Sequence, residues 1–217
     1  MDMNPGILIA VEGVDGAGKT TQVDRLTDFL RAAGEDAIRS KEPTTGRWGR
    51  LIRESASSGR MSLDDELAAF IADRDEHVRT VIQPSLNHGQ IVLLDRYFYS
   101  TIAYQGARGK DIDELTTLVL EKAPEPDAVI LLDVPAELGV SRVQGRGDRP
   151  NQFEELASLK TVRGIFLQLA QQRRNIIVID GTADTLTVQK AILTALLNGV
   201  LKSRSTCARM VALAAAI

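Results

Sequence analysis

The segment ILIAVEGVDGAGKTTQVDRL, residues 7–26, constrains the fold of this chain more than any other. It begins with an apolar run of strand length, passes through a glycine-rich turn, and continues with the spacing of an amphipathic helix. Residues 13–20 satisfy the pattern G-x-x-x-x-G-K-[ST]. Glycines let successive backbone N–H groups point inward, and the helix N-terminus adds a partial positive charge. This strand–loop–helix unit predicts a site for the phosphates of a nucleoside triphosphate.

The pattern also predicts what individual residues in the loop do. The Lys19 ammonium can reach the β- and γ-phosphates, and the Thr20 hydroxyl is suited to binding Mg²⁺. The residues expected to bind the triphosphate are Gly13, Val14, Asp15, Gly16, Ala17, Gly18, Lys19, Thr20 and Thr21.

The rest of the chain alternates between short apolar runs and longer amphipathic stretches. Apolar runs of strand length are Ile7–Glu12, Ile91–Asp95, Ala128–Val134 and Ile176–Asp180. Continuous apolar runs are typical of strands that are covered on both faces of a parallel sheet. The more charged run Asp36–Lys41 suits a position nearer the edge. Together they predict an α/β, P-loop NTPase-like fold: a doubly wound, parallel, five-stranded sheet flanked by helices.

Helix signals separate these strands. Ser62 and Asp65 resemble a capping box that begins a long helix through about Leu86. His77 and His88 fall on this helix and at its end, where we expect surface positions without a special role. One domain is expected over residues 1–198. The tail, residues 199–217, has an open role: its last apolar stretch continues the final helix, packs against a partner or is disordered.

Composition restricts the partners and the compartment. The net charge is −3, which argues against a nucleic-acid binder that works by bulk electrostatics. The single cysteine, Cys207, excludes an internal disulfide framework and fits a reducing cytoplasm. No run approaches the roughly 18 apolar residues needed to cross a bilayer. We therefore expect a cytoplasmic protein with small-molecule partners, and neither nucleic acid nor membrane among them.

A second group of candidate residues surrounds the strand at residues 91–95. Asp95 ends this strand, where ligands gather in open α/β sheets, and its carboxylate suits Mg²⁺ or the water around it. Arg96 carries the fork of donors that binds phosphate. The residues after it have helical spacing and predict a helix face of hydroxyls and rings: Tyr97, Ser100 or Thr101, and Tyr104.

Two further segments point to a nucleotide. Phe70 and Arg74 are four residues apart on the expected long helix, so a ring that stacks on a base and a guanidinium that bonds its edge share one face. Phe70 taken alone is explained equally well as a core aromatic. Arg142, Arg146 and Arg149 lie in a glycine-containing segment, which predicts a small basic lid at about residues 142–152 that excludes water.

Together these segments resemble the thymidylate kinase family. The matching segments are EGVDGAGKTT, Glu42-Pro43, FIADRDEHV, DRYFYSTIAYQG and SRVQGRGDRPNQFE, in family order from residue 7 to about 197. The resemblance implies Mg²⁺-dependent transfer of the ATP γ-phosphoryl group to dTMP, giving dTDP and ADP for dTTP biosynthesis. It also implies a homodimer. The variable positions of the glycine loop hold no arginine, so the resemblance is to the subgroup with its catalytic arginine in the lid.

The resemblance further implies a role for each matching residue. Phe70 stacks on thymine, Arg74 donates to the base carbonyl at position 4, and Tyr104 crowds the ribose 2′ position. The implied catalytic residues are Lys19, Asp15, Arg96, Arg146 and Arg149, and Arg142 contacts ATP. The implied Mg²⁺-binding residues are Thr20 and Asp95. The implied substrate-binding residues are Phe70, Arg74, Arg96, Tyr97, Ser100, Thr101, Tyr104 and Gln105.

Two alternatives remain open. The closer one is a kinase of the same fold whose acceptor is dUMP, a broader set of deoxynucleotides, or a nucleoside. The other is a non-catalytic nucleotide-binding switch. The chain has neither an Asn-Lys-x-Asp segment that reads guanine nor an Asp-x-x-Gly after the strand at residues 91–95. Phosphorylation of an acceptor distinguishes the kinases from the switch.

Overall fold

The computed structural model describes residues 5–145 and 152–217 of the chain. Its strands form a parallel sheet in the order β2-β3-β1-β4-β5. Their bounds are β1 Ile7–Glu12, β2 Ala37–Lys41, β3 Ile91–Asp95, β4 Ala128–Asp133 and β5 Ile176–Asp180. The predicted doubly wound, five-stranded sheet is confirmed. Every residue of β1 is buried, and the charged strand β2 lies at an edge, as its sequence predicts.

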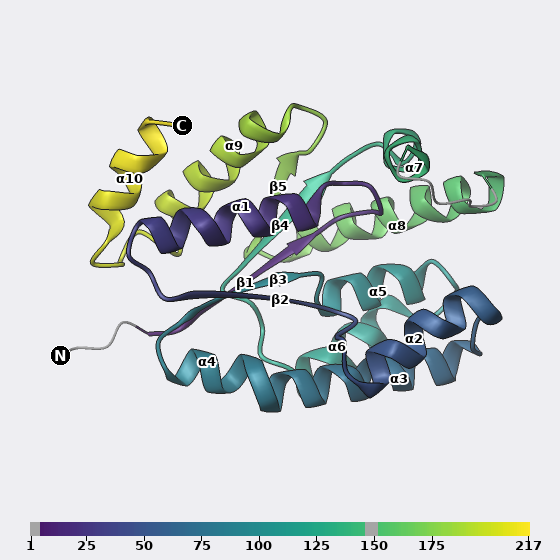
Figure 1. Ribbon diagram of the computed structural model, residues 1–217. Coiled ribbons are helices and arrows are strands. Elements are labelled where there is room, and N and C mark those ends of the chain that lie inside the picture. The colour runs from purple at the N-terminus through teal and green to yellow at the C-terminus, as the bar shows by residue number, and fades with distance from the viewer. Residues whose placement is uncertain (1–4, 146–151) are drawn as a thin grey trace.

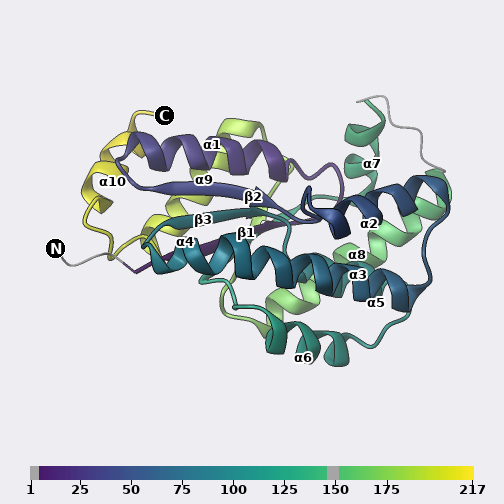
Figure 2. The ribbon, with the colours of Figure 1, turned by 60° about the horizontal axis from the view of Figure 1, so that its bottom comes forward.

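Helices cover both faces of the sheet (Figures 1 and 2). One face carries α1 (Lys19–Ala32), α9 (Thr185–Asn198) and α10 (Cys207–Ala215). The other carries α3 (Leu63–His77), α4 (Gln83–Asn87), α5 (Phe98–Gly106), α6 (Ile112–Lys122) and α8 (Gln152–Gln172). Helices α2 (Arg47–Ser58) and α7 (Ala136–Gln144) lie toward the carboxyl ends of the strands. The glycine loop and the residues that follow β2 and β3 therefore meet at one edge of the sheet.

The long helix predicted from Ser62 to about Leu86 begins as expected but is not one regular helix. The Ser62 hydroxyl accepts a hydrogen bond from the Asp65 N–H, as the capping pattern predicts. After α3 the backbone forms a π-helical turn, Val78–Ile82, in which the Gln83 N–H donates to the Val78 carbonyl. Pro84 has no N–H to continue an α-helical ladder, and the wider turn accommodates it at the start of α4.

The tail folds onto the chain instead of extending α9. Leu201 and Met210 are fully buried, and Arg204 is only 6% exposed. The Arg204 guanidinium pairs with the Glu35 carboxylate between α1 and β2, and its Nη1 donates to the Pro5 carbonyl at 2.8 Å. The tail thus joins the start of β1 to the end of α1, at the opposite end of the molecule from the glycine loop (Figure 1).

Replacing Arg204 with leucine is expected to lower the free energy of unfolding by about 3–5 kcal/mol, because Glu35 then stays buried without its partner. Urea denaturation measures this change, and Lys202→Ala, at an exposed position in the same tail, is the control with an expected change within about 0.5 kcal/mol. A loss no larger than that of the control would show that the ion pair does not anchor the tail.

Candidate active site

The glycine loop joins β1 to α1 and has the backbone that its glycines permit. Gly13, Gly16 and Gly18 have φ of 143°, 80° and 93°, in the region that side chains disfavour. Helix α7 lies directly on the loop, because a Cβ at Gly16 would be 2.2 Å from the Gly139 carbonyl oxygen. A Cβ at Gly139 would in turn be 2.5 Å from the Asp15 carbonyl oxygen. Gly139 is thus part of the loop's support, although the motif does not include it.

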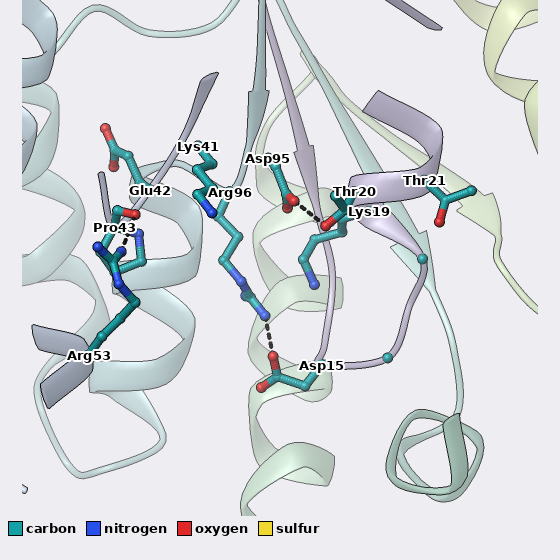
Figure 3. A pocket seen from close by; sticks show the side chains of 12 residues that line it. Asp15, Lys19, Thr20, Thr21, Lys41, Glu42, Pro43, Arg53, Asp95 and Arg96 are labelled. Carbon is teal, nitrogen blue, oxygen red and sulfur yellow. Dashed lines mark hydrogen bonds and ion pairs between the residues drawn. The ribbon is translucent and has the colours of Figure 1, made fainter. Parts of the chain in front are cut away.

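Lys19 and Thr20 begin α1, and the Lys19 side chain lies inside the bend of the loop (Figure 3). The buried Lys19 Nζ donates to the carbonyls of Gly13, at 3.1 Å, and Val14, at 2.8 Å. Burial, aided by the charge of Arg96, lowers the pKa of Lys19 to about 8, although nearby carboxylates oppose this shift. The Thr20 hydroxyl lies 2.5 Å from the Asp95 carboxylate, so two oxygen ligands suited to Mg²⁺ stand side by side.

Arg96 connects the loop to α5. It has φ of 69°, and among the described residues it is the one non-glycine residue in the left-handed region. Its Nη2 lies 2.5 Å from Asp15 Oδ1, while the Tyr104 hydroxyl donates to Asp15 Oδ2 at 2.7 Å. Burial opposes ionisation of Asp15, but the charges of Arg96 and Lys19 hold its pKa below the usual value. With this left-handed backbone, the Arg96 guanidinium lies against the loop, where it contacts Asp15.

Glu12 at the end of β1 is a site residue that the sequence patterns do not single out. It is 0% exposed and accepts hydrogen bonds from the backbone N–H groups of Tyr97, at 2.8 Å, and Ser100, at 3.1 Å. The Ser100 hydroxyl donates to its other oxygen at 2.5 Å. Burial raises the pKa of Glu12 to about 6 in spite of these bonds and the charge of Arg96. Glu12 therefore ties β1 to the N-terminus of α5.

The raised pKa of Glu12 predicts a distinct pH dependence. Its folded-state pKa of about 6 exceeds the ordinary pKa of 4.5 for a glutamate, so its contribution to stability is present below pH 4.5 and is lost as the pH rises through about 6. Relative to Glu12→Gln, the wild-type protein is expected to lose about 2 kcal/mol between pH 4.5 and pH 7. Denaturation of both proteins across this range measures the difference. A parallel pH dependence in the two proteins would contradict this prediction.

The first of two adjoining pockets lies at the mouth of the glycine loop (Figure 3). It is lined by Asp15, Gly16, Gly18, Lys19, Thr20, Thr21, Lys41, Glu42, Pro43, Arg53, Asp95 and Arg96. Four of these side chains are cationic. Lys41 and Arg53 are not among the predicted residues: Lys41 ends the edge strand β2, and Arg53 lies on α2, where its Nη1 donates to the Pro43 carbonyl at 2.8 Å. The Thr21 side chain points away from Lys19 and Arg96.

The second pocket lies between α3 and α5. It is lined by Asp15, Glu42, Pro43, Arg60, Phe70, Arg74, Arg96, Tyr97, Ser100, Thr101 and Tyr104. The rings of Phe70 and Tyr104 are half-buried and not sealed in the core. The structure thus brings seven of the eight predicted substrate-binding residues to one pocket. Gln105 does not line it, because its side chain is buried and donates to Glu66 at 2.6 Å.

Three expectations need correction or fall outside the structure. His77 is not at the surface: it is 3% exposed, and its Nδ1 lies 3.0 Å from the Glu42 carboxylate. Arg142 is not in a loop but in the last turn of α7, where its Nη1 donates to the Gly181 carbonyl at 3.1 Å. Arg146 and Arg149 lie outside the described residues.

The glycine loop and the aromatic pocket share a wall that contains Arg96 and Asp15. This arrangement is that of a P-loop kinase, which binds a second small ligand beside the nucleoside triphosphate. A model of the thymidylate kinase family matches residues 11–192, and the chain belongs to this family. It is 50% identical over 185 residues to a thymidylate kinase of Xanthomonas oryzae pv. oryzae (strain PXO99A), covering 85% of this chain and 80% of that protein. It is 46% identical over 191 residues to a thymidylate kinase of Xylella fastidiosa (strain M12), covering 87% of this chain and 85% of that protein.

Helices long and apolar enough to span a bilayer are absent from residues 5–145 and 152–217.

Proposed function

We propose that this chain transfers the γ-phosphoryl group of ATP to dTMP, giving dTDP and ADP. The observation that carries this proposal is the shared wall between the two pockets. Asp15, Glu42, Pro43 and Arg96 line both of them, so a triphosphate in the glycine loop and a monophosphate beside α5 would meet at Arg96. Membership of the thymidylate kinase family supports ATP and dTMP as these two ligands.

The triphosphate side of the site neutralises charge. Lys19 gives up its bonds to the Gly13 and Val14 carbonyls and donates to phosphate oxygens instead. Thr20 and Asp95 offer the oxygen ligands that Mg²⁺ takes, so they would hold the ion, which supplies further charge neutralisation when bound. The Thr20 and Asp95 side chains need to move little, because their oxygen atoms already stand together.

The acceptor side positions the nucleophile. Lys41, Arg53 and Arg96 all line the first pocket and would bind the monophosphate of dTMP. One oxygen of that monophosphate forms a bond to the γ-phosphorus, while the bond from this phosphorus to the β-phosphate oxygen breaks, and ADP leaves. The attacking oxygen is already anionic, so the step needs no general base. Alignment and charge neutralisation are therefore the work of the protein.

The second pocket selects the nucleoside. Phe70 stacks on the pyrimidine, and Arg74 donates to the carbonyl at position 4, where cytosine presents an amino group instead. Tyr104 crowds the ribose 2′ position and favours the deoxy sugar. Thr101 and Ser100 supply hydroxyls to the same pocket. Gln105 acts behind the pocket, because its side chain bonds Glu66 instead of lining the cavity.

The family resemblance supports a lid and a dimer as parts of this proposal. Arg146 and Arg149 complete the cation set around the transferring phosphoryl group, as in family members that place their catalytic arginine in the lid, and Arg142 contacts ATP. The chain acts as a cytoplasmic homodimer. Sedimentation equilibrium tests the dimer directly: a mass of about twice 23.6 kDa supports it, and the monomer mass overturns it.

A turnover screen with ATP tests the proposed reaction. Coupled assays with dTMP, dUMP, dCMP, UMP and thymidine are expected to give the highest kcat/KM for dTMP, a strong loss for dCMP because of Arg74, and a strong loss for UMP because of Tyr104. A higher kcat/KM for another acceptor would contradict dTMP as the substrate and would identify that acceptor instead. Binding of ATP without phosphorylation of any acceptor would indicate a non-catalytic nucleotide-binding protein.

A further inference from the structure

A buried polar chain runs from the edge strand β2 to the second pocket. The Ser40 hydroxyl lies 2.8 Å from His77 Nε2, and His77 Nδ1 lies 3.0 Å from Glu42 Oε1. The other carboxylate oxygen, Oε2, accepts from Arg74 Nε at 2.9 Å and lies 2.8 Å from Arg74 Nη2. Glu42, Arg74 and His77 are each less than a tenth exposed, so the contacts among these three form in a region shielded from water, whereas the Ser40–His77 contact is partly buried. Of these side chains, only Arg74 has a stated role in binding the base.

The hydrogen-bond donors of Arg74 show what this row of buried polar side chains achieves. A guanidinium has five N–H donors. Nε donates to Glu42, and Nη2 meets both Glu42 and Thr101, the latter at 2.9 Å. The guanidinium also lies over the Tyr97 ring, with 5.4 Å from its central carbon to the ring centroid. Within residues 5–145 and 152–217 Nη1 has no protein partner, so its two N–H groups are the ones left for a ligand in the pocket.

His77 fixes the carboxylate that fixes Arg74. An ionised carboxylate only accepts hydrogen bonds, so His77 Nδ1 must donate to Glu42. Ser40 holds the opposite side of the imidazole and sets the plane of the ring. Without the Nδ1–H, Glu42 Oε1 would be buried with no partner, and the carboxylate would turn to find one. That rotation would release Arg74 Nε and Nη2 and re-aim Nη1.

We propose that His77 is a positioning residue for pyrimidine selection: it acts through Glu42 to aim Arg74 Nη1 at the carbonyl of the bound base. This inference rests on the proposed function, since it concerns how the same pocket distinguishes dTMP from dCMP. The ligand feature that the aimed guanidinium reads is an acceptor at position 4 of a pyrimidine ring. His77 itself does not line the pocket.

The two nitrogens of His77 allow a matched test. His77→Asn keeps an N–H donor near the Nδ1 position, whereas His77→Gln places its amide near Nε2 and loses the bond to Glu42. His77→Gln is expected to lower kcat/KM for dTMP by about tenfold and to reduce the dTMP-to-dCMP selectivity ratio by a similar factor, the effect of losing one charge-assisted bond. His77→Asn is expected to stay within about threefold of wild type. The KM for ATP should stay within about twofold in both.

A double-mutant comparison with Arg74→Ala tests whether His77 acts through Arg74. In an Arg74→Ala background, which has already lost selectivity, His77→Gln is expected to cause no further loss of kcat/KM for dTMP, because His77 has nothing left to aim. His88→Gln, at an exposed position beyond α4, is the control and should match wild type. If His77→Gln does not fold, Ser40→Ala takes its place, with an expected fall of about threefold in the selectivity ratio.

Three results would overturn the inference. One is an unchanged dTMP-to-dCMP ratio in the folded His77 or Ser40 variants. A second is an equal loss of kcat/KM for dTMP and for ATP. A third is full additivity of His77→Gln with Arg74→Ala. Either of these two results would indicate a general structural role for His77. A wild-type protein that does not phosphorylate dTMP would overturn the proposed function as well. A wild-type protein that is selective for dTMP, with variants that keep this selectivity, overturns the inference alone.

Discussion

Lys19→Ala is expected to lower kcat by about 10²-fold or more, because it removes a cation from the charge that develops on the transferring phosphoryl group. Lys19 is buried inside the bend of the loop, where its ammonium already donates to the Gly13 and Val14 carbonyls. The KM for dTMP is expected to change much less than kcat, since Lys19 does not line the second pocket, which is proposed to bind the thymidine part of dTMP. Steady-state kinetics with saturating ATP and dTMP measures both constants.

The matched control for this variant is Lys190→Ala, which removes a lysine charge at an exposed position of α9. It should keep wild-type kcat, so that the loss in Lys19→Ala cannot be assigned to net charge. Thermal denaturation of both variants checks that each is folded. Turnover of Lys19→Ala within a factor of a few of wild type would contradict the role given to this residue.

Arg96→Ala and Arg96→Gly are both expected to lower kcat/KM for dTMP by about 10²- to 10³-fold. Arg96 lines both pockets, and its guanidinium bonds Asp15 and Ser100 at the same time. Loss of one such anchored cation removes the contact that aligns the acceptor phosphate with the triphosphate. Arg96→Lys should recover little of this activity, because an ammonium cannot make the forked contacts.

Because Arg96 has a left-handed backbone, the alanine and glycine variants should differ in stability although both lose activity. Alanine at φ of 69° costs about 1 kcal/mol that glycine does not, so Arg96→Gly is expected to be the more stable of the two inactive variants. Kinetics and urea denaturation on the pair test this. The role of Arg96 would be contradicted if either folded variant kept more than about a tenth of wild-type kcat/KM.

The sheet could be predicted from sequence because its strands have one physical explanation. An apolar run such as Ile91–Asp95 is typical of a strand that is covered on both faces of a parallel sheet, and its predicted bounds match β3. Helix α2 could not be predicted in the same way. Gly46 caps its start without a side-chain bond, so no capping residue marks it, and Trp48, Leu51 and Ile52, at the spacing of an amphipathic helix, are its one sequence signal.

The glycine loop, Asp95 and Arg96, which the sequence patterns identify, lie where strands β1 and β3 end, and the missed site residues depend on contacts between segments far apart in sequence. Gly139 matters because α7 lies on the loop, and Glu12 because α5 begins beside β1. His77 left a weak signal: it extends the stripe formed by Glu66, Ala69 and Asp73, the buried face of α3, at helical spacing. A polar residue on a buried stripe indicates a partner, but only the fold shows that this partner is Glu42.

A crystal structure with a bisubstrate compound, adenosine and thymidine joined 5′ to 5′ by five phosphates, together with Mg²⁺, tests most directly whether two nucleotides meet in line at Arg96. The predicted result is one compound per chain, with phosphates from the glycine loop past Arg96, thymine against Phe70, and Arg74 Nη1 at the carbonyl of position 4. A compound that leaves the second pocket empty, with its thymidine bound elsewhere, would contradict the head-to-head arrangement.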